Sequence, residues 1–208
     1  MLYGYEMPAI VGFHFQLPKD PKRVNALDAL HTRVSTPRLT DPPPSAEALE
    51  NIYKAAFRAA DHGLLRPWRF LVIQGDSRQK LGDLFIEAAL AKDPDVSDIQ
   101  QEKIRSKPMR APMVIVTIAV HKEHPKVPVF EMDLSAAAAT QNMLLAAHAQ
   151  GVGAMWRTGS MAFDRNVAAG LGLAENEKII GFLYLGTALG ETRNVILENP
   201  ADFFTEWP

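Results

Sequence analysis

The sequence predicts a layered α+β fold, in which helices cover both faces of a central sheet. Two runs, 113–120 and 178–186, are apolar at nearly every position and have the length of strands in the middle of a covered sheet. Segments with helical spacing of apolar residues stand between and around them. The chain has 208 residues, 47% of them hydrophobic, and no cysteine, so its core is expected to form without disulfides.

The N-terminal segment 1–24 is expected to be an irregular arm, because three prolines interrupt apolar residues that have no clear period. Its aromatic side chains, Phe13 and Phe15 among them, can pack on a neighbour or belong to a disordered segment, and the residues alone favour neither alternative. Residues 25–208 are expected to form a single domain.

The first two predicted helices follow residues that commonly cap helices. Asn25 precedes a short helix that ends near residue 32, and Ser45 precedes a longer one over 46–60. Glu47 stands in the first turn of the longer helix, where a negative charge is favourable. The other predicted helices are 77–91, 96–106, 131–150 and 164–171, and a third strand is predicted over 69–74.

The predicted helix 131–150 is rich in Ala and Met and carries hardly a charge after Asp133. A helix that is apolar on all sides is buried on several sides. We therefore expect it in the core or at a subunit interface. Gly151 and Gly153 end it.

Charge and missing motifs exclude several classes of function. Twenty-two Lys and Arg against 24 Asp and Glu leave a net charge of -2 and no basic block, which argues against nucleic-acid binding. No apolar stretch approaches the roughly 20 residues that a membrane span needs, and no signal peptide is recognisable, so a cytoplasmic location is expected. Phosphate-binding loops, zinc-protease motifs and nucleophile elbows are also missing.

Two histidine-containing pairs have simple explanations. His121 and His124, with Glu123 between them, stand on a polar turn and are expected to be solvated rather than metal ligands. Asp61 and His62 follow the predicted helix 46–60, where a histidine commonly interacts with the helix dipole. No metal site and no catalytic side chain are predicted.

Three segments are each a weak indication of function but are specific when taken together. They are 32–38, 58–68 and 151–159, the last followed by 181–187. Their order and spacing resemble the FMN-dependent nitroreductase family, in particular its branch of compact bacterial NAD(P)H nitroreductases. The resemblance covers about residues 25–187 and leaves the N-terminal arm outside. It implies a mixed central sheet wrapped by helices and an intertwined homodimer with two FMN sites at the subunit boundary.

The resemblance also implies roles for individual residues. Arg33 and Ser35 would hold the FMN phosphate and ribityl chain, with Val34 between them, and a guanidinium suits a phosphate because its donors match two oxygens. Arg58 and His62 would reach the flavin from the second subunit. The remaining cofactor-binding residues would present backbone amides to the flavin O4 and N5 edge, where Gly permits close approach; they are Trp156, Arg157, Thr158 and Gly159.

The sequence departs from the family pattern at two positions. Val34 stands where close relatives often carry a second basic residue, and Pro37 stands where many distant members place a lysine near the flavin N1–O2 edge. Reduced flavin gathers negative charge at that edge and needs a positive neighbour. The candidates for this charge are Arg38, Arg66 and Arg157.

Because no acid–base pair, nucleophile or metal site is recognisable, the difficult chemistry is expected to belong to a cofactor. The resemblance implies that NAD(P)H delivers hydride to the flavin and that a nitroaromatic, quinone or similar electron-poor acceptor then receives the electrons. Two alternatives remain open. One is a flavin-binding protein used for storage, sensing or flavin breakdown, and the other is an interaction protein without flavin.

Overall fold

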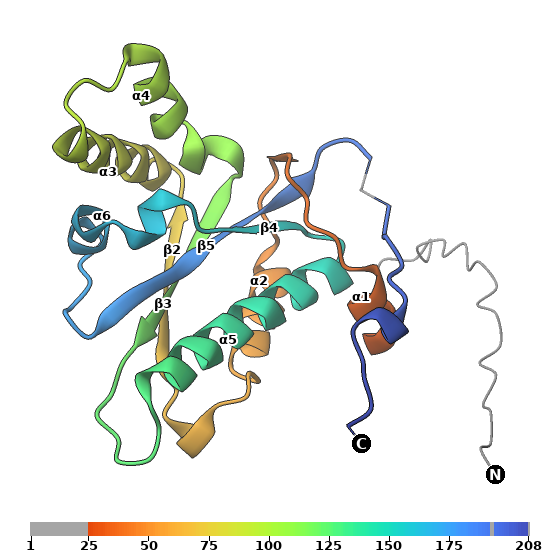
Figure 1. Cartoon of the computed structure of the whole chain (residues 1–208). Helices are drawn as coiled ribbons and strands as arrows, with labels where there is room; N and C mark the ends of the chain where they lie inside the picture. The colour runs from red at the N-terminus through yellow and green to blue at the C-terminus, as the bar shows by residue number, and fades with distance from the viewer. Residues whose placement is uncertain (1–24, 192–193, 208) are drawn as a thin grey trace, which may run out of the picture.

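The computed structural model describes residues 25–191 and 194–207 (Figure 1). The arm predicted over residues 1–24 lies outside this part of the chain. In chain order the elements are α1 (Ala26–Thr32), β1 (Leu39–Thr40), α2 (Ala46–Ala56), η1 (His62–Leu64), β2 (Trp68–Gln74), α3 (Ser77–Lys92), α4 (Asp98–Arg105), η2 (Lys107–Arg110), β3 (Met113–Val120), α5 (Val129–Ala149), β4 (Gly153–Arg157), η3 (Ser160–Phe163), α6 (Arg165–Gly170), β5 (Glu177–Ala188) and η4 (Pro200–Asp202).

The strands form one five-stranded sheet in the order β1-β5-β3-β2, with β4 paired to β5 outside this path. β3 and β4 both pair with the stretch of β5 around Phe182–Leu185, so they lie on opposite edges of that strand. They run in the same direction, but each pairing between described strands is antiparallel. The predicted α+β layered fold is confirmed. The described strands run in both directions, and each has only antiparallel neighbours.

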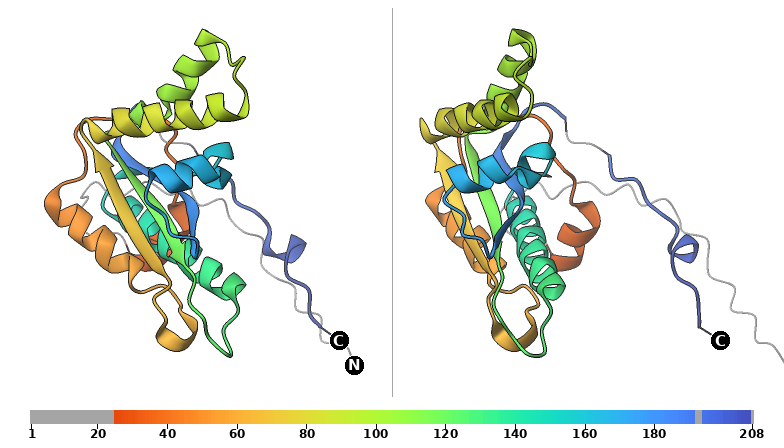
Figure 2. Two further views of the ribbon diagram at one scale, coloured as in Figure 1. Left: turned by 90° about the vertical axis from the view of Figure 1, so that its left-hand side faces the viewer. Right: turned by 60° about the vertical axis from the view of Figure 1, so that its left-hand side comes forward.

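Two helical layers cover the two faces of the sheet, as Figure 2 shows. On one face lie α3, α4 and α6; on the other lie α2 and α5. Side chains of β3 alternate between them: Val114 and Val116 belong to the core under α3, whereas Met113 and Ile115 belong to the core under α5. A strand with two buried faces explains why this run is apolar at nearly every position.

The helix α5 packs on the sheet along most of its length, which confirms the prediction that it is buried on several sides. Ala139 and Met143 lie in the core that it shares with α2 and the sheet. The Asn142 side chain donates to the carbonyl oxygen of Ala55 in α2 at 3.2 Å. Phe130 and Leu134 remain exposed, at 68% and 51%, on the side of α5 that the described residues leave uncovered.

Local signals explain where α1 and α2 begin. The Asn25 side chain accepts from the Leu27 amide, and the Ser45 hydroxyl accepts from the Ala48 amide, as the predicted caps require. The helix after Ser45 ends at Ala56 rather than at residue 60. The chain turns there, and His62 contacts Glu131 in the first turn of α5. Among the described residues no helix is long and apolar enough to cross a membrane.

Candidate functional site

The loop between α1 and β1 lies along the outer edge of β4. The Thr36 amide donates to the carbonyl oxygen of Ala154 at 2.8 Å, which joins the loop to this strand. Two of the three sequence segments, 32–38 and 151–159, are therefore neighbours in space. The third segment, 58–68, lies apart from these two, where His62 contacts the first turn of α5.

The outer edge of β4 has backbone groups free to bind a ligand. Because the Ala154 carbonyl points away from β5, the backbone groups of Trp156, two residues on, point the same way. Gly159 then adopts φ 62° and ψ -174°, a conformation that glycine alone adopts readily. A Cβ on Gly159 would meet nothing within 4 Å, so the space beside this glycine, two residues after β4, is open.

The Trp156 side chain, by contrast, packs inside the protein. A Cβ added to Gly181 in β5 would lie 2.1 Å from the indole Nε1, so the indole lies directly on that glycine. It also contacts the core cluster under α5. The Trp156 side chain is therefore packed against the core, while its backbone stays at the outer edge of β4.

Arg33 and its neighbours lie between the end of α1 and the part of the loop that contacts β4. Arg33, Val34 and Ser35 are half-buried after the end of α1. Arg33 takes part in none of the ion pairs among the described residues. Burial, and then the charge of Arg33, lower the pKa of His148 at the end of α5, which indicates that the guanidinium lies close to this imidazole.

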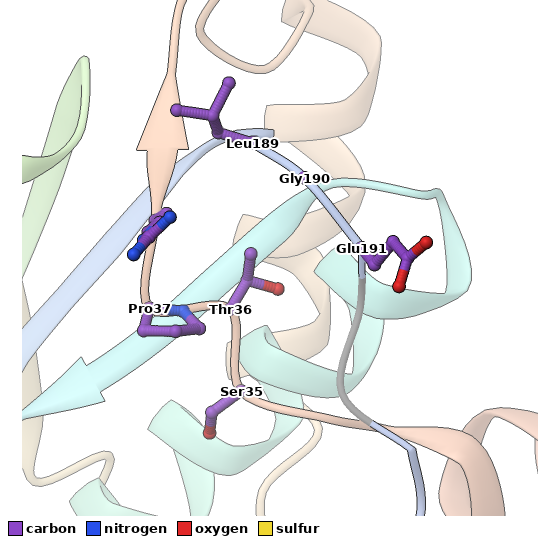
Figure 3. Close-up of a pocket in the computed structure, with 7 residues that line it drawn as sticks. Ser35, Thr36, Pro37, Leu189, Gly190 and Glu191 are labelled. Atoms are coloured by element: carbon purple, nitrogen blue, oxygen red, sulfur yellow. The ribbon is translucent and has the colours of Figure 1, made fainter.

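A cavity of about 200 Å³ opens beside Ser35. Figure 3 shows that residues of the α1–β1 loop and residues that follow β5 face one another across it. The lining consists of Ser35, Thr36, Pro37, Arg38, Leu189, Gly190 and Glu191. It combines a hydroxyl, an apolar wall and charges of both signs.

His62 lies at the opposite end of α5 from Arg33, and Arg58 lies in the chain between Ala55, which contacts the middle of α5, and His62. Asn51 in α2 contacts Gln150, Ala55 contacts Asn142, and His62 contacts Glu131, so the chain from α2 to η1 runs antiparallel to α5. Glu131 and His148 are separated by about 26 Å along α5 at roughly 1.5 Å per residue. Within one chain His62 and Arg33 are therefore too far apart to bind the same small ligand group.

The His62 ring is held by a carboxylate, not by a helix dipole. The explanation of His62 as a cap of the preceding helix is wrong, because α2 ends at Ala56 and His62 begins η1. Its Nδ1 lies 2.5 Å from a carboxylate oxygen of Glu131. Sequence reasoning missed Glu131, since the two residues are 69 positions apart and no local pattern joins them.

Of the three candidates for a positive charge near Pro37, Arg38 follows it in the chain and lines the same cavity, and Arg157 reaches it from β4. Its Nη2 donates to the Pro37 carbonyl oxygen at 3.5 Å, and its guanidinium lies 5.7 Å from the centre of the Tyr184 ring. Arg66 lies in the loop after η1, where its amide donates to the Asp61 carboxylate. Burial, followed by the charge of Arg110, lowers the pKa of Arg157, and Tyr184 opposes this shift.

The histidines of the 121–124 turn have partners of their own. His121 Nε2 lies 2.8 Å from Asp133, which also binds Lys178. His124 Nδ1 accepts from the amides of Lys126 and Val127. Within the described ranges no three His, Cys, Asp or Glu side chains gather to hold a metal ion.

Comparison with known proteins points to one family. The family model described as "Nitroreductase family" matches residues 30–187. The chain is 39% identical over 183 residues to the Escherichia coli (strain K12) protein named "Putative NAD(P)H nitroreductase YdjA", covering 88% of this chain and 99% of that one. It is 36% identical over 184 residues to a "Putative NAD(P)H nitroreductase" of Haemophilus influenzae, with the same coverage of 88% and 99%.

Solved structures share the fold. A nitroreductase-like family protein from Bacillus cereus superimposes with a TM-score of 0.75 at 20% identity, over 88% of this chain and 96% of that one. A nitroreductase with bound FMN from Bacteroides fragilis superimposes with a TM-score of 0.67 at 22% identity, over 89% and 100%.

Proposed function

The chain belongs to the nitroreductase family, and we propose that it is an FMN-dependent oxidoreductase that takes hydride from NAD(P)H and reduces electron-poor aromatic acceptors. The relatives named as NAD(P)H nitroreductases support the electron donor, and the Bacteroides fragilis nitroreductase, which binds FMN, supports the cofactor. The cytoplasm, where these dinucleotides are available, is the proposed location.

The observation that carries this proposal is the open edge of β4 beside an unneutralised arginine. A flat heterocycle with carbonyl and nitrogen acceptors along one edge fits the outward backbone groups at Trp156, and the open space beside Gly159 leaves room for it. A phosphate fits Arg33, whose charge no described carboxylate neutralises. The residues present therefore fit FMN.

In this arrangement Arg33 and Ser35 hold the phosphate and ribityl chain, with Val34 between them, and the backbone of residues 156–159 orients the ring. Arg157 supplies the positive charge near Pro37. FMN, when bound, accepts and donates hydride equivalents. The protein orients the ring and excludes water, and no side chain is assigned as a catalytic acid or base.

The proposed active form is a homodimer with the flavin sites between subunits. His62 stands about 26 Å along α5 from Arg33 in one chain, so we propose that a second copy brings its His62, together with Arg58, to this site. The exposed Phe130 and Leu134 on α5 offer an apolar contact surface for that copy.

Absorption spectroscopy of the purified protein tests the proposal. We expect a yellow protein whose flavin band bleaches under anaerobic conditions when NADH or NADPH is added and returns when a nitroaromatic or a quinone is added. A yellow protein that does not bleach would instead be a flavin-binding protein for storage, sensing or breakdown. A colourless protein that does not bind added FMN would contradict the flavin site altogether.

A further inference from the structure

A second cavity, of about 180 Å³, lies on the face of the sheet that α3 covers. Its wall is formed by η2, by β5 and by the segment from the end of β4 to η3. Three of the described residues that line it are cations, and none is acidic; the cations are Lys107, Arg110 and Arg157. Tyr184 and Ser160 add hydroxyl groups.

Arg110 influences the other two cations. Burial, followed by the charge of Arg110, lowers the pKa of Lys107. The same two causes, in the same order, lower the pKa of Arg157. Arg110 is exposed at the mouth of the cavity and lies close enough to act on both.

No acidic group compensates these charges within the part of the chain that the structure describes. None of the three residues takes part in an ion pair there. The Nε of Arg157 is buried and has no hydrogen-bond partner among the described atoms. Holding like charges together around an unpaired buried donor costs free energy unless a counter-charge is bound.

We propose that this cavity is a binding site for the oxyanion group of a small molecule, a phosphate or a carboxylate. Arg157, Lys107 and Arg110 supply positive charge at its wall, and the Ser160 hydroxyl offers a neutral donor. The cavity is smaller than the roughly 300–1,000 Å³ of sites that hold drug-sized ligands. It therefore receives one charged group, while the rest of the ligand lies outside.

The residues that line the cavity indicate where the rest of the ligand lies. Thr158 and Gly159 line the cavity and also belong to the segment that we propose to face the flavin ring. The Arg157 side chain and the Trp156 side chain point to opposite faces of the sheet, as consecutive residues of a strand do. If the proposed function holds, the charged group belongs to a substrate that binds beside the flavin; otherwise the site takes a free anion.

Calorimetric titration with inorganic phosphate at constant ionic strength tests the site without relying on flavin chemistry. We expect saturable binding of one phosphate per chain to the full-length protein in excess FMN, which occupies the proposed phosphate site at Arg33. Lys107→Gln and Arg110→Gln should each weaken it about ten- to a hundredfold, as the loss of a charge-assisted hydrogen bond does. Lys80→Gln, at an exposed lysine of α3, is the matched control and should bind normally. No saturable binding, or equal affinity in all four proteins, would overturn the site.

Steady-state kinetics of the same variants identify the source of the group. If it belongs to the acceptor, both variants should raise KM for 4-nitrobenzoate about tenfold or more and leave KM for the neutral 4-nitrobenzamide unchanged. If it belongs to the donor, KM for NADPH should rise relative to KM for NADH. If phosphate binding is lost and no KM changes, the ligand is a free anion. A protein that binds phosphate but never turns over would contradict the proposed function and leave this site standing.

Discussion

His148 Nε2, near the end of α5, lies 2.9 Å from the hydroxyl oxygen of Thr32, in the last turn of α1. That hydroxyl has a single proton and donates it to the carbonyl oxygen of Asp28 at 2.6 Å. The Thr32 oxygen must therefore accept from His148, so the imidazole carries a proton on Nε2. This contact fixes the end of α1, from which Arg33 and Ser35 follow.

The first prediction concerns pH. Burial and the charge of Arg33 lower the pKa of His148 in the folded state, whereas in the unfolded state it is expected near the ordinary value of about 6.5. As pH falls below that value, the unfolded chain binds the proton first, so the free energy of unfolding decreases. In urea denaturation between about pH 5 and 8, His148→Gln should show a smaller decrease than the unchanged protein. His31→Gln, at an exposed imidazole of α1, should show the same decrease as the unchanged protein. Equal slopes of the free energy of unfolding against pH for all three proteins would contradict the prediction.

Arg33→Ala should weaken FMN binding by about 1.5 to 3 kcal/mol, the usual contribution of a hydrogen bond to a charged group. Quenching of flavin fluorescence during titration measures this affinity. Arg165→Ala removes an exposed arginine of α6 and is the matched control. If Arg33→Ala and the control bind FMN equally well, Arg33 does not hold the phosphate.

Gly181→Ala should displace the Trp156 indole, because the new Cβ would lie 2.1 Å from Nε1 and 2.7 Å from Cδ1. We expect a loss of about 1 to 3 kcal/mol in the free energy of unfolding, together with weaker FMN binding as the β4 edge shifts. Chemical denaturation and flavin titration measure the two effects. Adding Trp156→Phe, which makes room for the methyl group, should restore part of both. A Gly181→Ala protein with unchanged stability would show that the indole adjusts freely.

The buried hydroxyls of Thr117 and Thr140 lie 2.9 Å apart between β3 and α5. Thr140 also lies 3.1 Å from the Ala136 carbonyl oxygen, so it donates there and accepts from Thr117. Thr140→Val should cost about 1 to 3 kcal/mol, since it leaves the Thr117 hydroxyl unpaired, and Thr117→Val should cost less. The double variant should be more stable than Thr140→Val alone. The reverse order in denaturation experiments would assign the proton differently.

Leu134→Arg should separate the proposed dimer, because Leu134 is 51% exposed on the uncovered side of α5. Analytical ultracentrifugation should then show a monomer, and the protein should lose its FMN because Arg58 and His62 of a second copy are missing. Ile99→Arg, at a 71% exposed position in α4 on the other face of the sheet, should change neither property. A monomer that retains FMN would contradict the shared site.

The sequence predicted the features that depend on local chemistry. The caps at Asn25 and Ser45 and the strand Met113–Val120 were correct, because a polar cap and a doubly buried strand each leave a signal within a few residues. The order of strands in the sheet and the strand β4 were not predicted. Both depend on β5, which follows β3 by more than fifty residues and pairs with β1, β3 and β4.

The candidate site likewise combines features that the sequence indicated and contacts that only the tertiary structure shows. The resemblance drew attention to residues 32–38 and 151–159, and the structure brings these segments together. It gave no sign that Glu131 holds His62 or that Lys107 and Arg110 gather around Arg157, since these partners come from separate elements. Their positions follow from tertiary packing and from no periodicity in the sequence.

The central position of β5 has a consequence for synthesis of the protein. Ribosomes release the chain from its N-terminus, so β1, β3 and β4 emerge well before the strand with which all three pair. Until β5, which begins at Glu177, is available, the β2–β3 pair is the one strand pairing that can form among those described. Nascent chains therefore expose the apolar faces of β3 and α5 from their own synthesis until β5 follows, and a chaperone that shields them should matter more for yield than for the finished enzyme.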